Sequence, residues 1–218
     1  YLQGVGELAK KYGALWIIDE THTISVGPDG MTGALGLKPD FLTIGKAIAG
    51  GIPTGTFGMT REVAAEITTR IDLDQVDTGG IGGTLAGNAL SLAAMRATLT
   101  EVLTPTAFDA MIALGKRWSE GVDAAIQEFN LPWCCNRLGA RAEYIFASVA
   151  PRTGREAANA GEFELEQYIH LRLRNDGFLL TPFHNIALMS PSTKEDDVDS
   201  HHQAVQRMCA DLSGLPTH

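Results

Sequence analysis

Lys46 stands alone as a charged residue in an otherwise apolar stretch of the sequence. Between Asp40 and Arg61 no other side chain carries a charge, and residues 47–51 are apolar or glycine. Burial in such surroundings would disfavour the ammonium form of the side chain, and a Schiff base or a general base needs the neutral amine. A surface lysine on a turn is the alternative interpretation. A Walker phosphate loop is excluded because Ala47, rather than Ser or Thr, follows the lysine.

Asp19 comes directly after the apolar run Ala14–Ile18, in which polar and apolar residues do not alternate. Such a run predicts a strand that is covered on both faces. Ligands of open α/β sheets bind just beyond the carboxyl ends of the strands, so this carboxylate is a candidate binding group. The alternative is an acidic residue that caps the following turn.

The segment Gly79–Gly87 is rich in glycine and leads into a predicted helix. Its successive backbone N–H groups and the Thr84 hydroxyl suit a phosphate near a helix N-terminus. The spacing does not match the Gly-x-Gly-x-x-Gly fingerprint of dinucleotide-binding proteins. A flexible linker is the alternative interpretation.

These three features together are the parts of a pyridoxal phosphate site: a carboxylate at a strand end, an isolated lysine and a glycine-threonine phosphate loop. The segments that carry them resemble the signature segments of class III aminotransferases, in the branch that holds glutamate-1-semialdehyde aminomutase and its relatives. The resemblance covers essentially the whole chain. Its segments are Ile17–Glu20, Thr43–Pro53, Gly83–Asn88, Asn136–Gly139 and Leu180–Pro182.

The resemblance implies an α/β fold with two parts. Residues 1–104 would be part of the cofactor-binding major domain of a fold-type I pyridoxal phosphate-dependent transferase. Residues 105–218 would form a linking helix and a small α+β C-terminal domain. Family members are about twice as long as this chain, so the sequence resembles their C-terminal half, and an N-terminal half would be a missing partner.

The resemblance also assigns roles to individual residues. Lys46 would be the catalytic residue, bound to pyridoxal 5'-phosphate as a Schiff base and later carrying a proton. Asp19 would pair with the pyridine nitrogen of the cofactor. Gly83 and Thr84 would bind the cofactor phosphate of a neighbouring subunit, which implies a homodimer with shared active sites. No metal is expected.

Two further cofactor-binding candidates depart from the family pattern. The family commonly has Val and then Gln or Met after the Asp-Glu pair, whereas this chain has Thr21 and His22. The first position lies behind the cofactor ring in the family and the second lies near its phenolic oxygen. We therefore expect the departures to affect the choice of substrate more than the identity of the cofactor.

The implied activity is the transfer of an amino group from an amino acid or amine to a keto or aldehyde acceptor. An intramolecular aminomutase of the glutamate-1-semialdehyde type is an alternative, because both reactions use the same cofactor chemistry. A non-catalytic fragment that retains the fold as a binding or assembly module is a third possibility. The pairing of Asp19 with Lys46 argues against it, since an anion-binding structural protein would need neither residue.

Other polar residues are weaker candidates. His201 and His202 are expected to lie in solvent on a final helix rather than to bind a metal. His184-Asn185 is expected to form a turn that hydrogen-bonds to its own backbone. Arg141 is expected to form a surface salt bridge, with a clamp on a substrate carboxylate as the less favoured interpretation.

The hydrophobic pattern predicts the elements that position these residues. In the first half we expect helices over 1–12, 61–70 and onward from Gly87, with Leu92, Met95, Leu99 and Val102 of the last helix on one face, and strands over 14–18, 41–44 and 55–59. A helix from Thr104-Pro105 should turn inward a stripe of Phe108, Met111, Trp118, Val122 and Phe129. After it we expect strands over 142–149, 178–180 and 186–189, a loop over 151–161, a helix ending at Asp176, and a final helix opened by a Ser192–Glu195 capping box.

Composition limits the remaining function classes. The chain has 218 residues with a net charge of −9, which argues against nucleic acid and anionic membrane surfaces as partners. Three cysteines, two of them adjacent, fit neither a disulfide framework nor a zinc site. The apolar runs are too short for a membrane span. We therefore expect a soluble cytoplasmic protein with small-molecule substrates.

Overall fold

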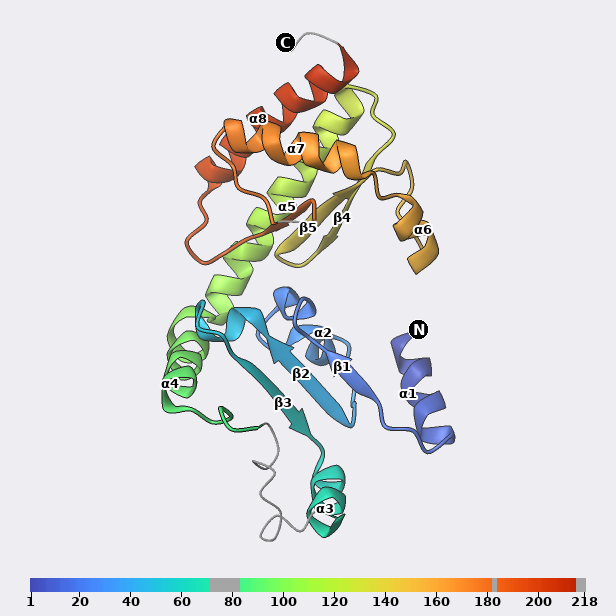
Figure 1. The fold of residues 1–218 in the computed structure, drawn as a ribbon, viewed down its shortest axis with the longest axis vertical. Helices are drawn as coiled ribbons and strands as arrows, with labels where there is room; N and C mark the ends of the chain where they lie inside the picture. Colours follow the sequence, from blue (N-terminus) through green and yellow to red (C-terminus); the bar gives the residue numbers. More distant parts are fainter. Residues whose placement is uncertain (71–82, 182–183, 215–218) are drawn as a thin grey trace. The chain divides into compact units, whose positions relative to one another are not determined.

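The structure is a computed structural model that describes residues 1–70, 83–181 and 184–214. The chain divides into two compact units, Tyr1–Pro105 and Thr106–His218 (Figure 1). Each unit has its own sheet of three strands. The units are described separately below.

The first unit is built on a mixed sheet in the order β1-β2-β3. Strand β1 (Ile17–Asp19) runs parallel to β2 (Phe41–Gly45), and β3 (Gly55–Met59) pairs antiparallel with β2. The expected strands over 41–44 and 55–59 are confirmed. The helices of this unit are α1 (Leu2–Lys11), α2 (Gly30–Ala34), α3 (Arg61–Arg70) and α4 (Ala89–Ala97), and a π-helical turn over Thr98–Val102 follows α4.

Helix α1 ends where glycine allows the chain to turn. Gly13 has a φ of 64°, in the left-handed region that favours glycine after a helix. The chain then enters β1, but this strand is shorter than the expected span of 14–18. The prediction that it is covered on both faces is wrong, because Leu15 and Ile17 are exposed. The apolar run forms a strand as expected, but nothing in the described chain covers these two side chains.

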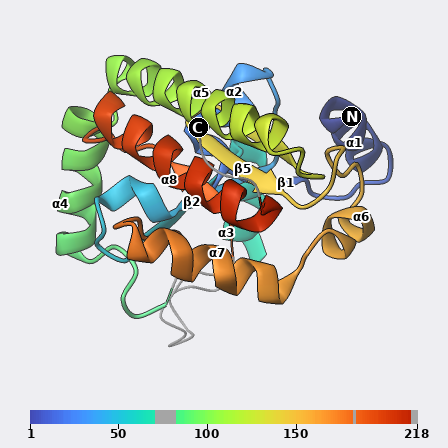
Figure 2. The ribbon, with the colours of Figure 1, turned by 90° about the horizontal axis from the view of Figure 1, so that it is seen from above.

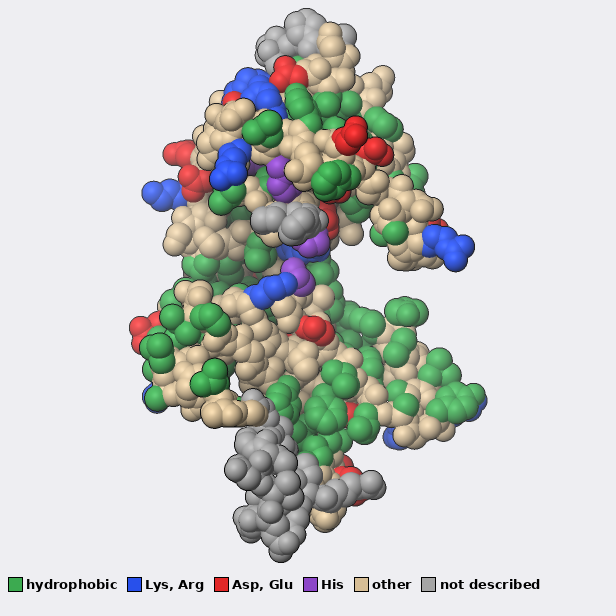
Figure 3. All heavy atoms as spheres, in the orientation of Figure 1, with side chains coloured by type: hydrophobic (Ala, Val, Ile, Leu, Met, Phe, Trp, Pro, Cys, Tyr) green, Lys and Arg blue, Asp and Glu red, His purple; other side chains and the backbone are tan. Residues whose placement is uncertain are grey.

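Helix α4 also leaves apolar side chains exposed. Asn88 caps its first turn by accepting a hydrogen bond from Ser91 N at 2.9 Å. The face expected to turn inward is exposed at Leu92, Leu99 and Val102. Figure 3 shows hydrophobic side chains over both α1 and α4 of the first unit. The periodicity therefore predicted the helix, whereas the expected burial of this face is wrong for the described residues.

The second unit packs helices around an antiparallel sheet of β4 (Cys134–Leu138), β5 (Arg141–Ile145) and β6 (Ile186–Leu188). Its helices are α5 (Pro105–Glu128), α6 (Gly154–Asn159), α7 (Phe163–Asn175) and α8 (Glu195–Ser213). Figure 2 shows α8 between α5 and α7. Side-chain pairs from Arg117 to Asp199 and from Arg172 to Asp211 join α8 to these two helices.

Helix α5 supplies much of the core of this unit. Pro105 occupies its first position, as expected, where the missing N–H costs nothing. The predicted inward stripe is confirmed, because every member of it is buried: Phe108, Met111, Trp118, Val122 and Phe129. Trp118 is 2% exposed, and its ring stacks on that of Tyr144 with the ring centroids 6.2 Å apart.

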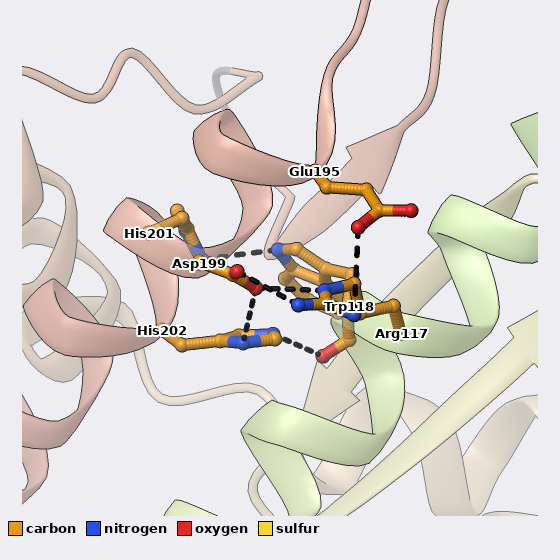
Figure 4. A network of polar contacts seen from close by, with 6 residues as sticks. All are labelled: Arg117, Trp118, Glu195, Asp199, His201 and His202. Atoms are coloured by element: carbon orange, nitrogen blue, oxygen red, sulfur yellow. Dashed lines mark hydrogen bonds and ion pairs between the residues drawn. The ribbon is translucent and has the colours of Figure 1, made fainter.

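Two histidines of α8 pack onto Trp118, which corrects the expectation that they lie in solvent (Figure 4). The indole Nε1 donates to Nδ1 of His201 at 3.0 Å, and Nε2 of His202 lies 3.2 Å from the Trp118 carbonyl oxygen. His201 is 6% exposed, and burial lowers its pKa to about 4. The imidazole of His201 is therefore neutral near pH 7, with Nδ1 as an acceptor.

Gly121 explains how α5 and α8 approach each other at this point. A Cβ added to Gly121 would lie 2.2 Å from ring atoms of His202, closer than real Cβ contacts. Glycine in a helix interior costs about 1 kcal/mol relative to alanine. Glycine is needed at position 121 despite this cost, because a larger side chain would overlap the imidazole of His202.

The smaller elements of this unit differ from the prediction in several places. The expected loop over 151–161 contains α6, and residues 178–180 form no strand. Strand β5 ends at Ile145 rather than Val149, β6 ends at Leu188 rather than Met189, and β4 was not predicted. Helix α7 ends at Asn175, next to the expected Asp176. At the start of α8, the Asp197 carboxylate accepts from Lys194 N at 2.9 Å in place of the expected Ser192–Glu195 pair.

Candidate cofactor site

The first unit brings two of the predicted site residues to one edge of its sheet. Asp19 is the last residue of β1 and is paired in register with Thr43 of β2. Lys46 comes directly after β2 ends at Gly45. Because β1 and β2 are parallel neighbours, their carboxyl ends lie at the same edge, where α/β sheets bind ligands.

Lys46 lies in a sparsely populated backbone conformation and contacts His22. Its φ is 51°, in the left-handed region that a residue with a side chain seldom adopts. Its Nζ lies 2.6 Å from Nε2 of His22. The predicted apolar burial of the lysine is wrong for the described chain, because the side chain is exposed. The apolar residues that follow it are instead the ones that pack inward, with Ile48 and Ala49 buried.

Asp19 is held as an ionised carboxylate. Its Oδ1 accepts a hydrogen bond from Thr21 N at 2.8 Å. The hydrogen bonds from Thr21 lower the pKa of Asp19, and electrostatic interactions with His22 and Lys46 lower it further. Asp19 therefore caps the turn at Thr21, the alternative that the sequence offered, and its pairing with a cofactor nitrogen remains a prediction. Asp19, Thr21, His22 and Lys46 form one cluster.

Glu20, the buried neighbour of Asp19 in the sequence, was not predicted as a site residue. It is 1% exposed, and its carboxylate accepts hydrogen bonds from the Thr23 hydroxyl, from Met31 N at 3.1 Å and from Thr32 N at 2.5 Å. Gly30 lies against it with a φ of 61°, and a Cβ there would lie 2.7 Å from Oε2. Glu20 therefore fixes the loop that carries Thr21 and His22.

The pKa of Glu20 makes the loop sensitive to acid. Burial raises this pKa, but the hydrogen bonds from Thr23, Thr32 and Met31 lower it by more, so the folded value lies below that of the unfolded chain. The carboxylate therefore stabilises the fold above the unfolded pKa of about 4.3, and this contribution is lost as pH falls through the lowered folded value.

Replacement of Glu20 by Gln is expected to lower the free energy of unfolding by about 1–3 kcal/mol near pH 7, because the amide NH₂ would face backbone donors without a partner. Urea unfolding between pH 3 and pH 7 measures this loss, and the difference from wild type should shrink toward the acid end. Glu62→Gln, at an exposed position of α3, is the matched control. Equal stability of the two variants near pH 7 would contradict the prediction.

Gly83 and Thr84, the predicted phosphate ligands, are exposed in the turn before α4. Residues Gly79–Gly82 of the same predicted loop lie outside the described residues. In the described chain the structure records no contact between Thr84 and Lys46. Helix α4 instead meets the segment after Lys46, where Ser91 Oγ lies 3.4 Å from the Pro53 carbonyl oxygen. The phosphate role of this loop remains a prediction.

Arg141 and His184 of the second unit are placed as expected for structural roles. Arg141 Nη2 lies 3.0 Å from a carboxylate oxygen of Glu143, which is the expected salt bridge. His184 is exposed, and its backbone N–H donates to the Thr181 carbonyl oxygen at 3.3 Å. Asn185 is buried. Pro182, part of the resemblance noted from the sequence, lies outside the described residues.

The chain is similar to curated glutamate-1-semialdehyde aminomutases. Glutamate-1-semialdehyde 2,1-aminomutase of Anaeromyxobacter dehalogenans is 33% identical over 201 residues, which are 91% of this chain and 45% of that protein. Glutamate-1-semialdehyde 2,1-aminomutase 2 of Staphylococcus haemolyticus is 33% identical over 199 residues, with 90% and 45% covered. The chain thus spans about half the length of the curated relatives it matches.

Solved structures share the fold at the same coverage. A glutamate-1-semialdehyde aminomutase from Pseudomonas aeruginosa, solved in complex with PMP, superposes with a TM-score of 0.90 at 46% identity. The match covers 96% of this chain and 47% of that one. A β-phenylalanine aminotransferase from Variovorax paradoxus gives a TM-score of 0.85 at 26% identity, covering 98% and 48%. The predicted α/β fold is therefore confirmed.

None of the helices in the described part of the chain has the length and apolar character that a membrane span requires. The family model named Aminotransferase class-III matches residues 1–208, nearly the whole sequence. The predicted resemblance is confirmed, and the chain belongs to the class-III aminotransferase family.

Proposed function

We propose that the edge formed by Asp19 and Lys46 binds pyridoxal 5'-phosphate and that this chain takes part in amino-group transfer. The observation that carries the proposal is the cluster at the carboxyl ends of β1 and β2, where an exposed primary amine contacts an imidazole and electrostatically affects an ionised carboxylate. These two side chains fit the cofactor, because the Lys46 amine can bind its aldehyde and the Asp19 carboxylate can pair with its pyridinium nitrogen. The solved relative from Pseudomonas aeruginosa, which contains PMP, supports the same cofactor.

When bound, pyridoxal phosphate supplies an aldehyde that condenses with amines and a ring that accepts electrons from the bond that breaks. Lys46 would attach the cofactor and carry the proton between positions on the substrate. Asp19, kept ionised by Thr21, would face the ring nitrogen and hold its proton. Thr21 and His22 would line the ring from the loop that Glu20 fixes.

We further propose the architecture in which these residues act. The first unit would be part of the cofactor-binding major domain, and α5 with the rest of the second unit would be the linking helix and small C-terminal domain. Gly83 and Thr84 would bind the cofactor phosphate of a second subunit in a homodimer. An N-terminal half like that of the relatives would complete each site, because the chain spans about half of their length.

The comparisons favour the intramolecular aminomutase over the two-substrate transaminase that the sequence placed first. The two curated relatives described above are glutamate-1-semialdehyde aminomutases, and so is the solved structure at 46% identity. We therefore propose an aminomutase that moves an amino group within one small substrate. A transaminase is the second candidate, supported by the TM-score of 0.85 to the β-phenylalanine aminotransferase.

The cofactor proposal is tested by mapping the attachment site. The protein is incubated with pyridoxal phosphate, reduced with borohydride, digested and analysed by mass spectrometry. The expected result is a pyridoxyl group on the peptide that contains Lys46. An adduct confined to Lys10, Lys11 or Lys38 would refute the proposed site, and the absence of any adduct would favour a non-catalytic module.

The type of reaction is tested with the loaded protein and one substrate at a time. An aminomutase converts glutamate-1-semialdehyde into an isomer of unchanged mass without a second substrate. A transaminase instead needs both an amino donor and a carbonyl acceptor, and it changes the mass of each. Turnover only in the presence of both partners would overturn the aminomutase proposal.

A further inference from the structure

The side chains of Lys46 and His22 are in direct contact, and the tautomer of the imidazole sets the direction of their hydrogen bond. Nζ of Lys46 and Nε2 of His22 are 2.6 Å apart, within hydrogen-bond distance. A lysine ammonium has only donors, so the ring nitrogen that faces it must be the acceptor. The tautomer that pairs with an ammonium has an unprotonated Nε2 and its proton on Nδ1. An unprotonated ring nitrogen pointed at an ammonium is the geometry of a general base and its acid.

Two charged side chains lie near His22. Asp19, at the end of β1, interacts electrostatically with both His22 and Lys46, and Lys46 contacts His22 directly. The carboxylate of Asp19 stabilises an imidazolium, while the ammonium of Lys46 opposes it. Movement of a proton from Lys46 to His22 transfers the positive charge to the imidazole, where it still interacts with the carboxylate of Asp19.

The loop geometry keeps the imidazole in place. His22 directly precedes the 3-10 turn over Thr23–Val26. Glu20 accepts hydrogen bonds from Thr23 within that turn and from Met31 and Thr32 of α2. The turn that follows His22 is therefore tied through the Thr23 hydroxyl to a buried carboxylate, so little ordering is needed for the proton to move.

We propose that His22 is the general base that deprotonates Lys46 for attack on a carbonyl, an inference that rests on the proposed cofactor chemistry of Lys46. The N–H bond of the ammonium breaks and an N–H bond forms at Nε2, leaving an electron pair on Nζ. This pair forms the bond to the carbonyl carbon. His22 returns its proton to the carbonyl oxygen, and a second N–H proton of the addition product passes through His22 to the same oxygen, which then leaves as water. One ammonium and one carbonyl thus give one protonated C=N group and one water.

This role gives a reason for the departure at position 22. The Gln or Met that the family commonly places there cannot accept a proton in the physiological range, whereas an imidazole can. A Gln side chain retains an oxygen that can accept a hydrogen bond from Nζ. His22→Gln therefore removes proton transfer while it keeps a hydrogen-bond acceptor, which makes it the matched variant.

The test measures the reactivity of Lys46 without cofactor or turnover. The full 218-residue chain and its His22→Gln variant receive a short pulse of formaldehyde with cyanoborohydride between pH 6 and pH 9. Peptide mass spectrometry then gives the labelling rate of each lysine. Lys10 and Lys38, both exposed in the same unit, are internal references for reagent and folding.

We expect Lys46 to lose about tenfold or more in labelling rate in the Gln variant near pH 7, since general acid–base catalysis typically contributes 10²- to 10⁴-fold. The two reference lysines should not change. The wild-type rate profile of Lys46 should also show an inflection in the imidazole range that the variant lacks. Nitrogen NMR of wild-type His22 should show Nε2 as the unprotonated nitrogen.

Equal labelling of Lys46 in the two proteins across the pH series would overturn the role of His22. The pyridoxal phosphate mapping, repeated on both proteins, separates this failure from failure of the proposed function. A pyridoxyl group on Lys46 with equal rates in both proteins would retain the cofactor site and reject the base. A rate of formaldehyde labelling that depends on His22, without a pyridoxyl group on Lys46, would retain the base and reject the cofactor site.

Discussion

Replacement of Lys46 by alanine is expected to abolish covalent cofactor attachment and to reduce amino-group transfer by about 10⁴-fold or more. The lysine is the proposed point of attachment and the proposed proton carrier, and loss of an acid–base group alone typically costs 10²- to 10⁴-fold. The measurement is the amount of pyridoxyl peptide after borohydride reduction, together with turnover of the loaded protein. Both readouts should fall in parallel.

Two further variants show whether this loss is specific. Lys46→Arg keeps a positive charge beside His22 and Asp19 but cannot form the C=N bond, so it should lose attachment as completely as the alanine variant. Lys38→Ala changes an exposed lysine of the same unit and should retain both readouts. Turnover by Lys46→Ala within tenfold of wild type would contradict the assignment of the attachment site.

The second large effect is expected in the core of the other unit, where Trp118→Ala should destabilise the fold by about 3–5 kcal/mol. The indole is 2% exposed, stacks on Tyr144 and donates to His201. The alanine variant leaves a cavity and also leaves Nδ1 of a buried, neutral imidazole without its donor. Urea unfolding, followed by circular dichroism, measures the loss.

Trp118→Phe separates the two contributions. It retains most of the ring volume but removes the Nε1–H, so its cost should approach that of one unsatisfied buried group, about 1–3 kcal/mol. The double variant Trp118→Phe, His201→Leu should recover part of this loss, because neither side then carries a polar group. A Trp118→Ala protein that unfolds at the wild-type urea concentration would contradict the central role of this indole.

Local signals made much of the fold predictable from the sequence. Pro105 and the apolar stripe defined α5, and the apolar runs before Asp19 and Lys46 located β1 and β2. Other signals were present but weak. Thr153 accepts from Glu156 N at the start of α6, a pairing that the spacing Thr-x-x-Glu could have indicated within the expected loop.

The burial of His201 was also readable in principle. Val198, His201, Val205 and Met208 follow each other at intervals of three or four residues, which places them on one face of a helix. The polarity of histidine hid this periodicity, because its partner, the indole of Trp118, lies 83 positions away in the sequence. Pairings over such distances depend on the tertiary fold rather than on a local pattern.

At the candidate site too, some residues could be predicted from the sequence and others could not. The sequence identified Asp19, Lys46 and His22 because their types and positions relative to strands suggest chemistry. It did not identify Glu20, whose partners Met31 and Thr32 contribute backbone N–H groups that no residue type reveals. The sequence also predicted, wrongly for the described residues, that Lys46 and both faces of β1 are buried. An apolar run indicates that a segment tends to be buried, but it does not identify the part of the protein that would cover it.

The left-handed backbone at Lys46 has a consequence for protein engineering. With a φ of 51°, position 46 is one that glycine or asparagine would occupy at lower conformational cost than lysine. A variant library ranked by thermal resistance alone would therefore tend to discard the lysine and to enrich the proteins that have lost the amine. A screen for improved variants of this chain should therefore measure both the reactivity of the lysine amine and the melting temperature. At position 46, selection for reactivity favours lysine, whereas selection for stability favours glycine or asparagine.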